Sequence, residues 1–206
     1  MDSSQKPLKI VHVINTLETG GAERLISNLL PLLKQKGDQV ELICLTEKVQ
    51  SSFFDELTQQ GIRIHFLSRT RSVYSPLHIL SLYGQLKRSG ADIIHAHLFP
   101  TFYWVAACRF LFHIKPLLVV TEHSSLNKRV ISGRWKIPDR LAYRQFRLVV
   151  CISDGVRQAI KRYMPFVNTE TIHNGIPLEK YAGPYSGTVD PELSRHIEHI
   201  RRQPHN

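Results

Sequence analysis

Several histidines stand where apolar segments of this chain end. His95 and His97 lie in the run ADIIHAH, and His123 follows the run LLVVTE. An imidazole can hydrogen-bond a hydroxyl group, exchange a proton near neutral pH or bind a metal ion. These three residues are therefore the first candidates for a functional site.

The spacing of His95 and His97 limits what the pair can do. Because they are two residues apart on a predicted strand, their side chains project from the same face. A metal pair needs further ligands, and the sequence places no cysteine or carboxylate to complete such a site, so we expect no metal. A hydrogen bond to a substrate and a purely structural role both stay open for this pair, and for His123 as well.

A pair of glycines follows the first apolar run. Residues Ile10–Ile14 are typical of a buried strand, Gly20 and Gly21 come shortly afterwards, and apolar residues at three- and four-residue steps then predict a helix to Leu33. A helix N-terminus attracts anions, and glycine lets a ligand approach the backbone closely. A phosphate seat and an ordinary turn both explain the pattern. The chain has no GxGxxG sequence, so the dinucleotide fingerprint is absent.

Two further polar residues have ordinary explanations. Ser153 directly precedes a helical pattern and is expected to be its N-cap, and no GxSxG sequence surrounds it to suggest a nucleophile. Glu23 lies in the first turn of the first predicted helix, where we expect it to complement the helix dipole.

These candidates need a scaffold of alternating strands and helices. The apolar runs predict seven strands, at residues 10–14, 39–45, 62–67, 91–96, 117–121, 147–152 and 169–172. Helical patterns are found at residues 22–33, 53–60, 76–90, 99–112, 134–146 and 153–163. The alternation predicts an α/β fold, a Rossmann-like, doubly wound parallel sheet covered on both faces. In such a sheet ligands bind at the carboxyl ends of the strands, where the polar residues named above fall.

The composition is that of a globular domain with a basic surface. The 206 residues are 42% hydrophobic and 21% charged, and 27 lysines and arginines against 17 acidic residues give a net charge of +10. Ten of the basic residues fall between Lys128 and Arg162, where Arg140, Arg144 and Arg147 are expected on one helical face. Such a helix can bind an anionic membrane or simply face solvent, and both remain open. No reading helix or aromatic platform is recognisable, so nucleic acid is not an expected partner.

The expected location is the cytoplasm, with the inner face of the membrane as an alternative. The N-terminal MDSSQKP lacks the apolar core of a signal peptide, and the apolar stretch Leu98–Val120 is interrupted by charges and a proline. The three cysteines sit in apolar segments without metal spacing, which favours reduced thiols in a cytosolic protein. We expect one domain over residues 1–183, followed by a linker or tail over residues 184–206.

Five segments together resemble a known enzyme family. GGAER, DIIHAH, VVTEHS, VVCISDGVRQ and IHNGIPLEKY occur in this order between Lys9 and Tyr181. In type and order they are similar to segments of the family 4 (group 1 type) glycosyltransferases, which have the GT-B fold of two Rossmann-like domains. The chain resembles the N-terminal, acceptor-side domain of that fold.

The resemblance implies a retaining transferase of the hexosyltransferase type, in polysaccharide or glycolipid biosynthesis. Its donor substrate would be a nucleotide diphosphate sugar, and no other cofactor would be needed. It implies that His123 is catalytic and that Gly20 and Gly21 approach the donor diphosphate. It also implies that the sugar or lipid-linked acceptor is bound by His97, Glu122 and Ser124. Asn174 and Gly175 would lie between the two domains.

The chain departs from the family in one respect. The family's second domain binds the nucleotide and carries two glutamates eight positions apart, whereas Glu192 and Glu198 have another spacing. We therefore expect the donor to be bound by a missing or separate domain, and the chain to be incomplete for catalysis alone: a fragment, a truncated product or one subunit of a split transferase. The alternative is a non-catalytic module that binds an acceptor or a membrane. A nucleotide-dependent oxidoreductase is disfavoured by the missing fingerprint.

Overall fold

The computed structural model describes residues 6–47, 52–124 and 134–175. Some of the expectations above fall outside these ranges, namely those on the start of the basic stretch at Lys128, on Glu192 and Glu198, and on residues 184–206.

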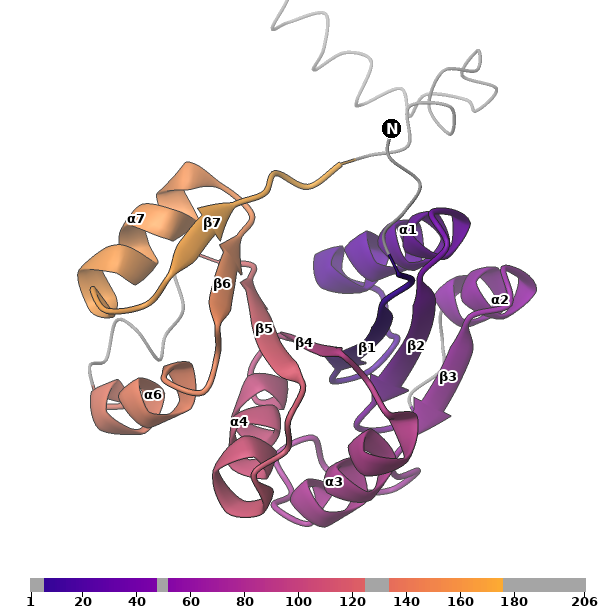
Figure 1. The fold of residues 1–206 in the computed structure, drawn as a ribbon, viewed down its shortest axis with the longest axis horizontal. Coiled ribbons are helices and arrows are strands. Elements are labelled where there is room, and N and C mark those ends of the chain that lie inside the picture. The colour runs from indigo at the N-terminus through magenta and orange to yellow at the C-terminus, as the bar shows by residue number, and fades with distance from the viewer. Residues whose placement is uncertain (1–5, 48–51, 125–133, 176–206) are drawn as a thin grey trace, which may run out of the picture. The chain divides into compact units, whose positions relative to one another are not determined.

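The described residues contain seven parallel strands that form one sheet (Figure 1). The strands are β1 (Lys9–Ile14), β2 (Gln39–Cys44), β3 (Arg63–Phe66), β4 (Ile93–His97), β5 (Leu117–Glu122), β6 (Leu148–Cys151) and β7 (Thr169–Thr171). Their order across the sheet is β3-β2-β1-β4-β5-β6-β7, and each neighbouring pair is parallel. The direction of winding therefore reverses between β1 and β4.

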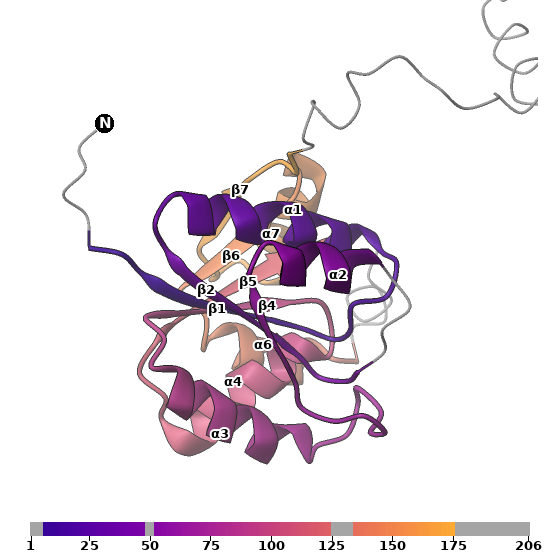
Figure 2. The ribbon, with the colours of Figure 1, turned by 90° about the vertical axis from the view of Figure 1, so that its right-hand side faces the viewer.

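Helices cover the sheet on both faces. They are α1 (Gly21–Gln35), α2 (Ser52–Gln59), α3 (His78–Ser89), α4 (Thr101–Phe112), α6 (Lys136–Tyr143) and α7 (Asp154–Tyr163). Helices α1 and α2 lie on one face and α3 and α4 on the other, as Figure 2 shows. Apolar side chains of α6 and α7 pack into the same core as those of α3 and α4.

The alternation of side chains along each strand divides the core in two. On β1, Val11 and Val13 pack towards α3 and α4, whereas Ile14 packs with Leu42 of β2 and Ile26 of α1. All five side chains are fully buried. A strand that is buried on both faces is apolar at nearly every position, which explains the continuous runs in the sequence.

The predicted fold class is confirmed, and each predicted strand and helix is present. One detail was wrong: α6 ends at Tyr143, so Arg147 does not share a helical face with Arg140 and Arg144. The chain leaves the helix because the backbone N–H of Arg147 donates to the carbonyl of Leu118, 2.8 Å away, where β6 begins to pair with β5.

Two further expectations can be compared with the described residues. The three cysteines, Cys44, Cys108 and Cys151, are buried and form no disulfide. Within the described ranges, we find no helix with both the length and the apolar character needed to cross a bilayer.

Candidate functional site

The candidate site lies at the carboxyl ends of β1 and β4, where the winding of the sheet reverses. In an open parallel sheet this reversal leaves a crevice between the loops that leave the two strands, and ligands bind there. The loop after β1 leads to Gly20 and Gly21 at the start of α1, and β4 ends at His97. Next to β4, β5 ends at Glu122, directly before His123.

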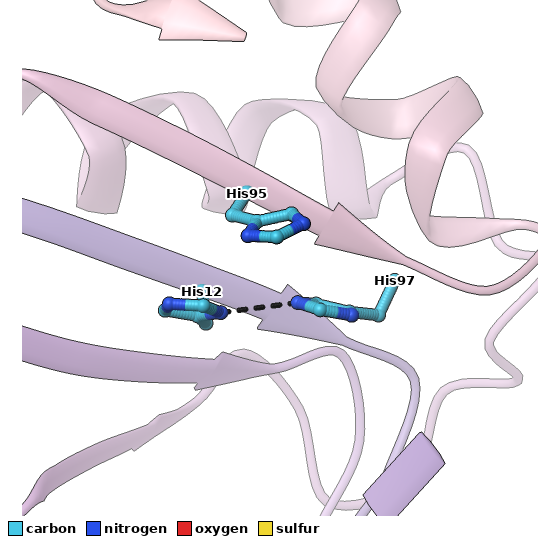
Figure 3. Close-up of side chains that lie close together, drawn as sticks. All are labelled: His12, His95 and His97. Atoms are coloured by element: carbon cyan, nitrogen blue, oxygen red, sulfur yellow. Dashed lines mark hydrogen bonds between the residues drawn. The ribbon is translucent and has the colours of Figure 1, made fainter. Parts of the chain in front are cut away.

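Three histidines cluster on the α1 face of β1 and β4 (Figure 3). His12 is paired in register with His95, and His97 follows on the same face of β4. His12 Nδ1 and His97 Nε2 are 3.0 Å apart in a hydrogen bond, and the rings of His95 and His97 stack with centroids 4.3 Å apart. His95 Nε2 is also hydrogen-bonded to Thr121 Oγ1 of β5, 2.7 Å away. The sheet register therefore fixes all three rings.

Burial keeps these imidazoles neutral. It lowers the pKa of His12 from 6.5 to about 3 and the pKa of His123 to about 4. The pKa values of His95 and His97 are also well below the ordinary value, first because of burial and second because a charge on one ring would repel a charge on its neighbours. At neutral pH each ring therefore offers one N–H donor and one acceptor nitrogen.

Some of these nitrogens have no partner in the described part of the chain. They are His12 Nε2, His97 Nδ1 and His123 Nε2, all buried. The rings of His97 and His123 lie 5.7 Å apart between centroids. A buried polar atom without a hydrogen bond costs about 1–3 kcal/mol, so a ligand that supplies one at this place gains binding free energy.

The three clustered histidines are also close enough to be considered as metal ligands. Ligand nitrogens of His12, His95 and His97 lie within 4.8 Å of one another. The lone pair of an imidazole nitrogen lies in the ring plane, so three ligands must aim their planes at one point. Here the planes of His12 and His97 differ by 17° and those of His95 and His97 by 30°, with His95 stacked on its neighbour. This arrangement suits a hydrogen-bonded stack better than a metal centre.

The side chain of Glu23 lies close to Gly20 in the glycine turn. A Cβ atom on Gly20 would lie 2.3 Å from Oε2 of Glu23, so with any other residue at position 20 this carboxylate would have to move from its place over the start of α1. The pKa of Glu23 is raised, chiefly by burial; a backbone hydrogen bond opposes the shift and the charge of Glu18 adds to it. A Cβ on Gly21 would meet no atom within 4 Å. Of the two glycines, Gly21 is the one with room for an approaching ligand.

The two acceptor-binding candidates at the end of β5 and just after it differ in exposure. Glu122 is 8% exposed, and its carboxylate accepts a hydrogen bond from the Tyr143 hydroxyl of α6. Because side chains alternate along a strand, Glu122 lies on the opposite face of the sheet from Thr121 and the clustered histidines. Ser124 is exposed. A role in acceptor binding stays a prediction for both residues.

The candidates at the ends of β6 and β7 are placed as follows. Ser153 is the N-cap of α7, because its Oγ accepts a hydrogen bond from the backbone N–H of Val156 at 3.3 Å, which confirms the predicted cap. Asn174 and Gly175 are exposed in the segment that follows β7. Their interdomain role stays a prediction.

Two residues at this edge were not found from the sequence. His12 sits inside the apolar run IVHVI, and its partner on β4 becomes visible only when the strand order is known. Asn15, directly after β1, donates from Nδ2 to the carbonyl of Phe99 at 2.9 Å and accepts at Oδ1 from the Thr101 hydroxyl at 2.6 Å. A polar residue inside an apolar strand and one at its end are the signals that could have drawn attention to them.

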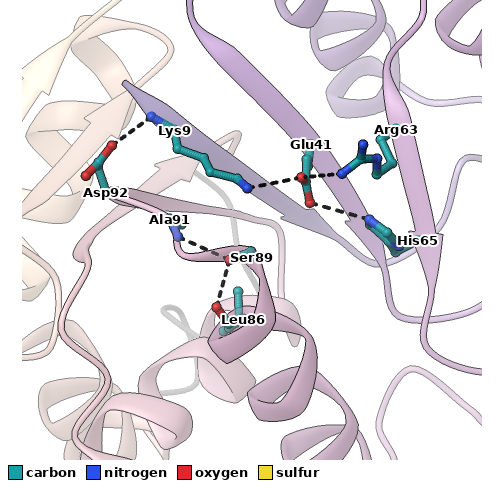
Figure 4. A network of polar contacts seen from close by, with 8 residues as sticks. All are labelled: Lys9, Glu41, Arg63, His65, Leu86, Ser89, Ala91 and Asp92. Atoms are coloured by element: carbon teal, nitrogen blue, oxygen red, sulfur yellow. Dashed lines mark hydrogen bonds and ion pairs between the residues drawn. The ribbon is translucent and has the colours of Figure 1, made fainter. Parts of the chain in front are cut away.

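A second polar network lies away from this edge and has a structural explanation (Figure 4). The buried carboxylate of Glu41 on β2 contacts Lys9 of β1 at 3.5 Å, and Arg63 and His65 of β3 at 3.1 and 3.4 Å. A buried carboxylate needs such partners, and here they come from both neighbouring strands. Glu41 therefore helps to hold β1, β2 and β3 together.

The sequence matches the model of one protein family, Glycosyltransferase Family 4, over residues 19–180. Among curated proteins it is similar to the capsular polysaccharide biosynthesis glycosyltransferase CapH of Staphylococcus aureus. The two are 28% identical over 91 residues, which are 44% of this chain and 24% of CapH.

Several solved structures share the fold. The Anabaena protein Alr3699/HepE in complex with UDP and glucose superposes with a TM-score of 0.64 at 18% identity, over 94% of this chain and 50% of HepE. A glycosyltransferase of Rickettsia africae gives a TM-score of 0.65 at 19% identity, over 98% of this chain and 51% of that protein. The chain thus spans about half the length of these structures and matches about a quarter of CapH.

Proposed function

The chain belongs to Glycosyltransferase Family 4, and on this premise we propose that it is the acceptor-side part of an enzyme that transfers a sugar from a nucleoside diphosphate sugar to an acceptor. Its sheet is the N-terminal, Rossmann-like half of a GT-B fold. HepE has been solved with UDP and with UDP-glucose, which supports UDP-sugars as the first donors to examine.

The observation that carries this proposal is the set of unpartnered imidazole nitrogens at the reversal of the sheet. His97 is buried and His123 half-buried, both are neutral, and each keeps a buried nitrogen without a partner among the described residues. Sugar hydroxyls both donate and accept hydrogen bonds, so they can satisfy either tautomer. We assign His97 to the acceptor.

In this proposal His123 acts on the transfer step itself. As the bond between the sugar and the diphosphate breaks, charge develops that a fixed imidazole can stabilise or position through a hydrogen bond. Retention by this route needs no nucleophile from the protein, so His123 has a positioning and electrostatic role.

The donor diphosphate is assigned to the start of α1. The first N–H groups of a helix and its dipole favour a negative charge. Because the side chain of Glu23 already lies over Gly20, we centre this seat on Gly21, where open space surrounds the backbone. The proposed transfer uses no metal ion and no cofactor besides the donor substrate.

The proposed acceptor is a saccharide or a lipid-linked saccharide, and the proposed place is the inner face of the cytoplasmic membrane. The net charge of +10 supports attraction to an anionic surface. Lys136 and Arg140 of α6 and its C-cap residue Arg144 are exposed at four-residue spacing, which supports the same partner.

Sugar transfer is the direct test. Because the chain spans about half of its structural relatives, the assay uses a polypeptide that joins it to a nucleotide-binding half. Transfer of labelled sugar from UDP- and GDP-sugars to soluble and lipid-linked saccharides is measured. We expect His123→Ala to lower kcat at least about tenfold, or about 1.4 kcal/mol in the barrier, at an unchanged melting temperature.

A matched control tests whether replacing any partly buried histidine by alanine would lower kcat. His65→Ala changes the edge strand β3, away from the reversal of the sheet, and should leave kcat unchanged. An unchanged kcat in His123→Ala would remove this residue from the site. Acceptor binding without transfer from any donor would favour the alternative, a non-catalytic acceptor-binding module.

A further inference from the structure

Helices α4 and α6 form a surface on the other side of the sheet from the histidine cluster. Both pack on the core that lies opposite to α1. A groove of about 170 Å³ runs between them, and its lining includes Phe110 of α4 and Pro138 and Leu141 of α6. We call this groove, together with the exposed side chains of α6 beside it, the α4–α6 surface.

Large apolar side chains are exposed on the α4–α6 surface. Ile137 is 75% exposed, Phe110 66% and Leu141 55%. Ile137 and Leu141 are four residues apart, so they lie on one face of α6, next to the groove. Large apolar groups gathered in this way on a folded domain mark a surface that binds something apolar.

A basic stripe runs beside these apolar side chains. Lys136, Arg140 and Arg144 follow one another at four-residue steps, and all three are exposed. The guanidinium groups of Arg140 and Arg144 each lie 5.8 Å from the ring centre of Phe166, which keeps them over an apolar neighbour.

Acidic groups are absent from the exposed part of these two helices. Helix α4 has no aspartate or glutamate, and α6 has one, Asp139. Asp139 is fully buried and accepts hydrogen bonds from the hydroxyls of Tyr103 and Tyr163, the latter at 2.8 Å. The exposed face of α6 therefore carries basic and apolar side chains, with no exposed acidic side chain to neutralise the positive charge.

We propose that the α4–α6 surface docks on an anionic lipid bilayer, with Phe110, Ile137 and Leu141 entering the boundary between headgroups and acyl chains. The basic stripe then faces the anionic headgroups. A short helix with a charged face and an apolar face lies flat in this boundary in this way. This inference deepens the membrane partner of the proposed function and names the side chains that make the contact.

Charge complementarity favours a membrane over a second copy of this chain. In a symmetric dimer through this surface both copies would bring Lys136, Arg140 and Arg144 to the interface, and neither α4 nor α6 offers an exposed acid to pair with them. Like charges across an interface oppose association, whereas an anionic bilayer pairs with each of them.

Vesicle binding by the 206-residue chain tests the proposal without any sugar transfer. Flotation is measured with vesicles of phosphatidylcholine alone and of phosphatidylcholine mixed with phosphatidylglycerol. We expect binding to the mixed vesicles only. Two double variants, Ile137→Ser with Leu141→Ser and Arg140→Gln with Arg144→Gln, should each weaken it at least about tenfold. All four residues are exposed, and thermal melting checks that each variant folds.

The matched control is Leu32→Ser, which removes a side chain of similar exposure, 54%, from α1 on the other face of the sheet. It should leave vesicle binding within about twofold of the parent chain. Equal binding to both vesicle types, or full binding by either double variant, would overturn the proposal. So would a dimer in solution that Ile137→Ser with Leu141→Ser dissociates, because a second copy would then cover the surface. A failed transfer assay with intact vesicle binding would affect only the enzymatic part of the proposed function.

Discussion

Mild acid should unfold this domain, and the buried histidines are the reason. His12, His95 and His97 lie side by side inside the structure, where burial keeps each ring neutral. In the unfolded chain the same rings are free to take up protons near their ordinary pKa of 6.5. Lowering the pH therefore stabilises the unfolded state relative to the folded one.

The pKa values set the size of this effect. Burial lowers the pKa of His12 from 6.5 to about 3, so at about pH 5 the unfolded chain binds nearly one proton more at this residue, which costs the fold about 2 kcal/mol. Burial lowers the pKa of His123 to about 4, so this residue costs the fold about 2 kcal/mol more at the same pH, and the lowered pKa values of His95 and His97 act in the same direction. Together these shifts remove a large part of the stability of an ordinary domain, which is about 5–15 kcal/mol.

The sign follows from the direction of the pKa shifts. A base whose pKa is lowered by folding contributes its full stability above pH 6.5 and loses it as the pH falls towards the folded-state value. Glu23 acts in the opposite direction, because its raised pKa favours protonation in the folded state. Glu23 is one group, whereas folding lowers the pKa values of five histidines, so the histidines decide the outcome: His12, His78, His95, His97 and His123.

Urea unfolding followed by circular dichroism, at steps from about pH 7.5 to about pH 5, measures the effect. The free energy of unfolding should fall steeply below about pH 6.5. His12→Phe should reduce that slope by about 1.4 kcal/mol per pH unit, even if it also changes the stability at neutral pH. A flat profile, or the same slope in His12→Phe as in the parent chain, would refute the reasoning.

Three further predictions concern the rest of the edge. Gly21→Ala should leave the melting temperature unchanged, because a Cβ there meets no atom within 4 Å, and should weaken binding of a nucleoside diphosphate; calorimetry that shows an unchanged affinity would contradict this assignment. Tyr143→Phe removes a hydrogen bond to the buried Glu122 and should cost about 1–3 kcal/mol in urea unfolding, and a change near zero would show that the carboxylate does not need it. Treatment with EDTA should leave sugar transfer by the completed enzyme unchanged, and a lost rate that Zn²⁺ or Mg²⁺ restores would assign a metal to the reaction.

Much of the fold can be predicted because the sheet is parallel and buried. Strands such as Gln39–Cys44 and Leu117–Glu122 read as apolar runs, and the helices between them keep a clear three- and four-residue pattern. Helix ends were harder: α6 stops at Tyr143 because Arg147 is drawn into pairing with β5, a contact between segments that are far apart in the sequence.

Only those residues of the candidate site that lie at strand ends could be identified from the sequence. His97 and His123 stand at strand ends, where polar residues attract attention. His12 lies within a strand. It is next to His95 only because β1 pairs with β4, although β2 and β3 lie between these two strands in the sequence. The contact of Glu23 with Gly20 was also not foreseen, since a glycine pair by itself does not say whether a ligand or the chain's own side chain fills the space.

The hydrogen bonds of Asn15 have a mechanical consequence for the crevice. They fasten the end of β1 to Phe99 and Thr101, at the turn where β4 passes into α4, so the two sides of the crevice are tied at their base. Leu17 of the same loop is fully buried in the core beneath α1, so the loop is anchored in the core as well as at the strand end. The ends of β1 and β4 therefore form a fixed frame that keeps the spacing of the clustered histidines.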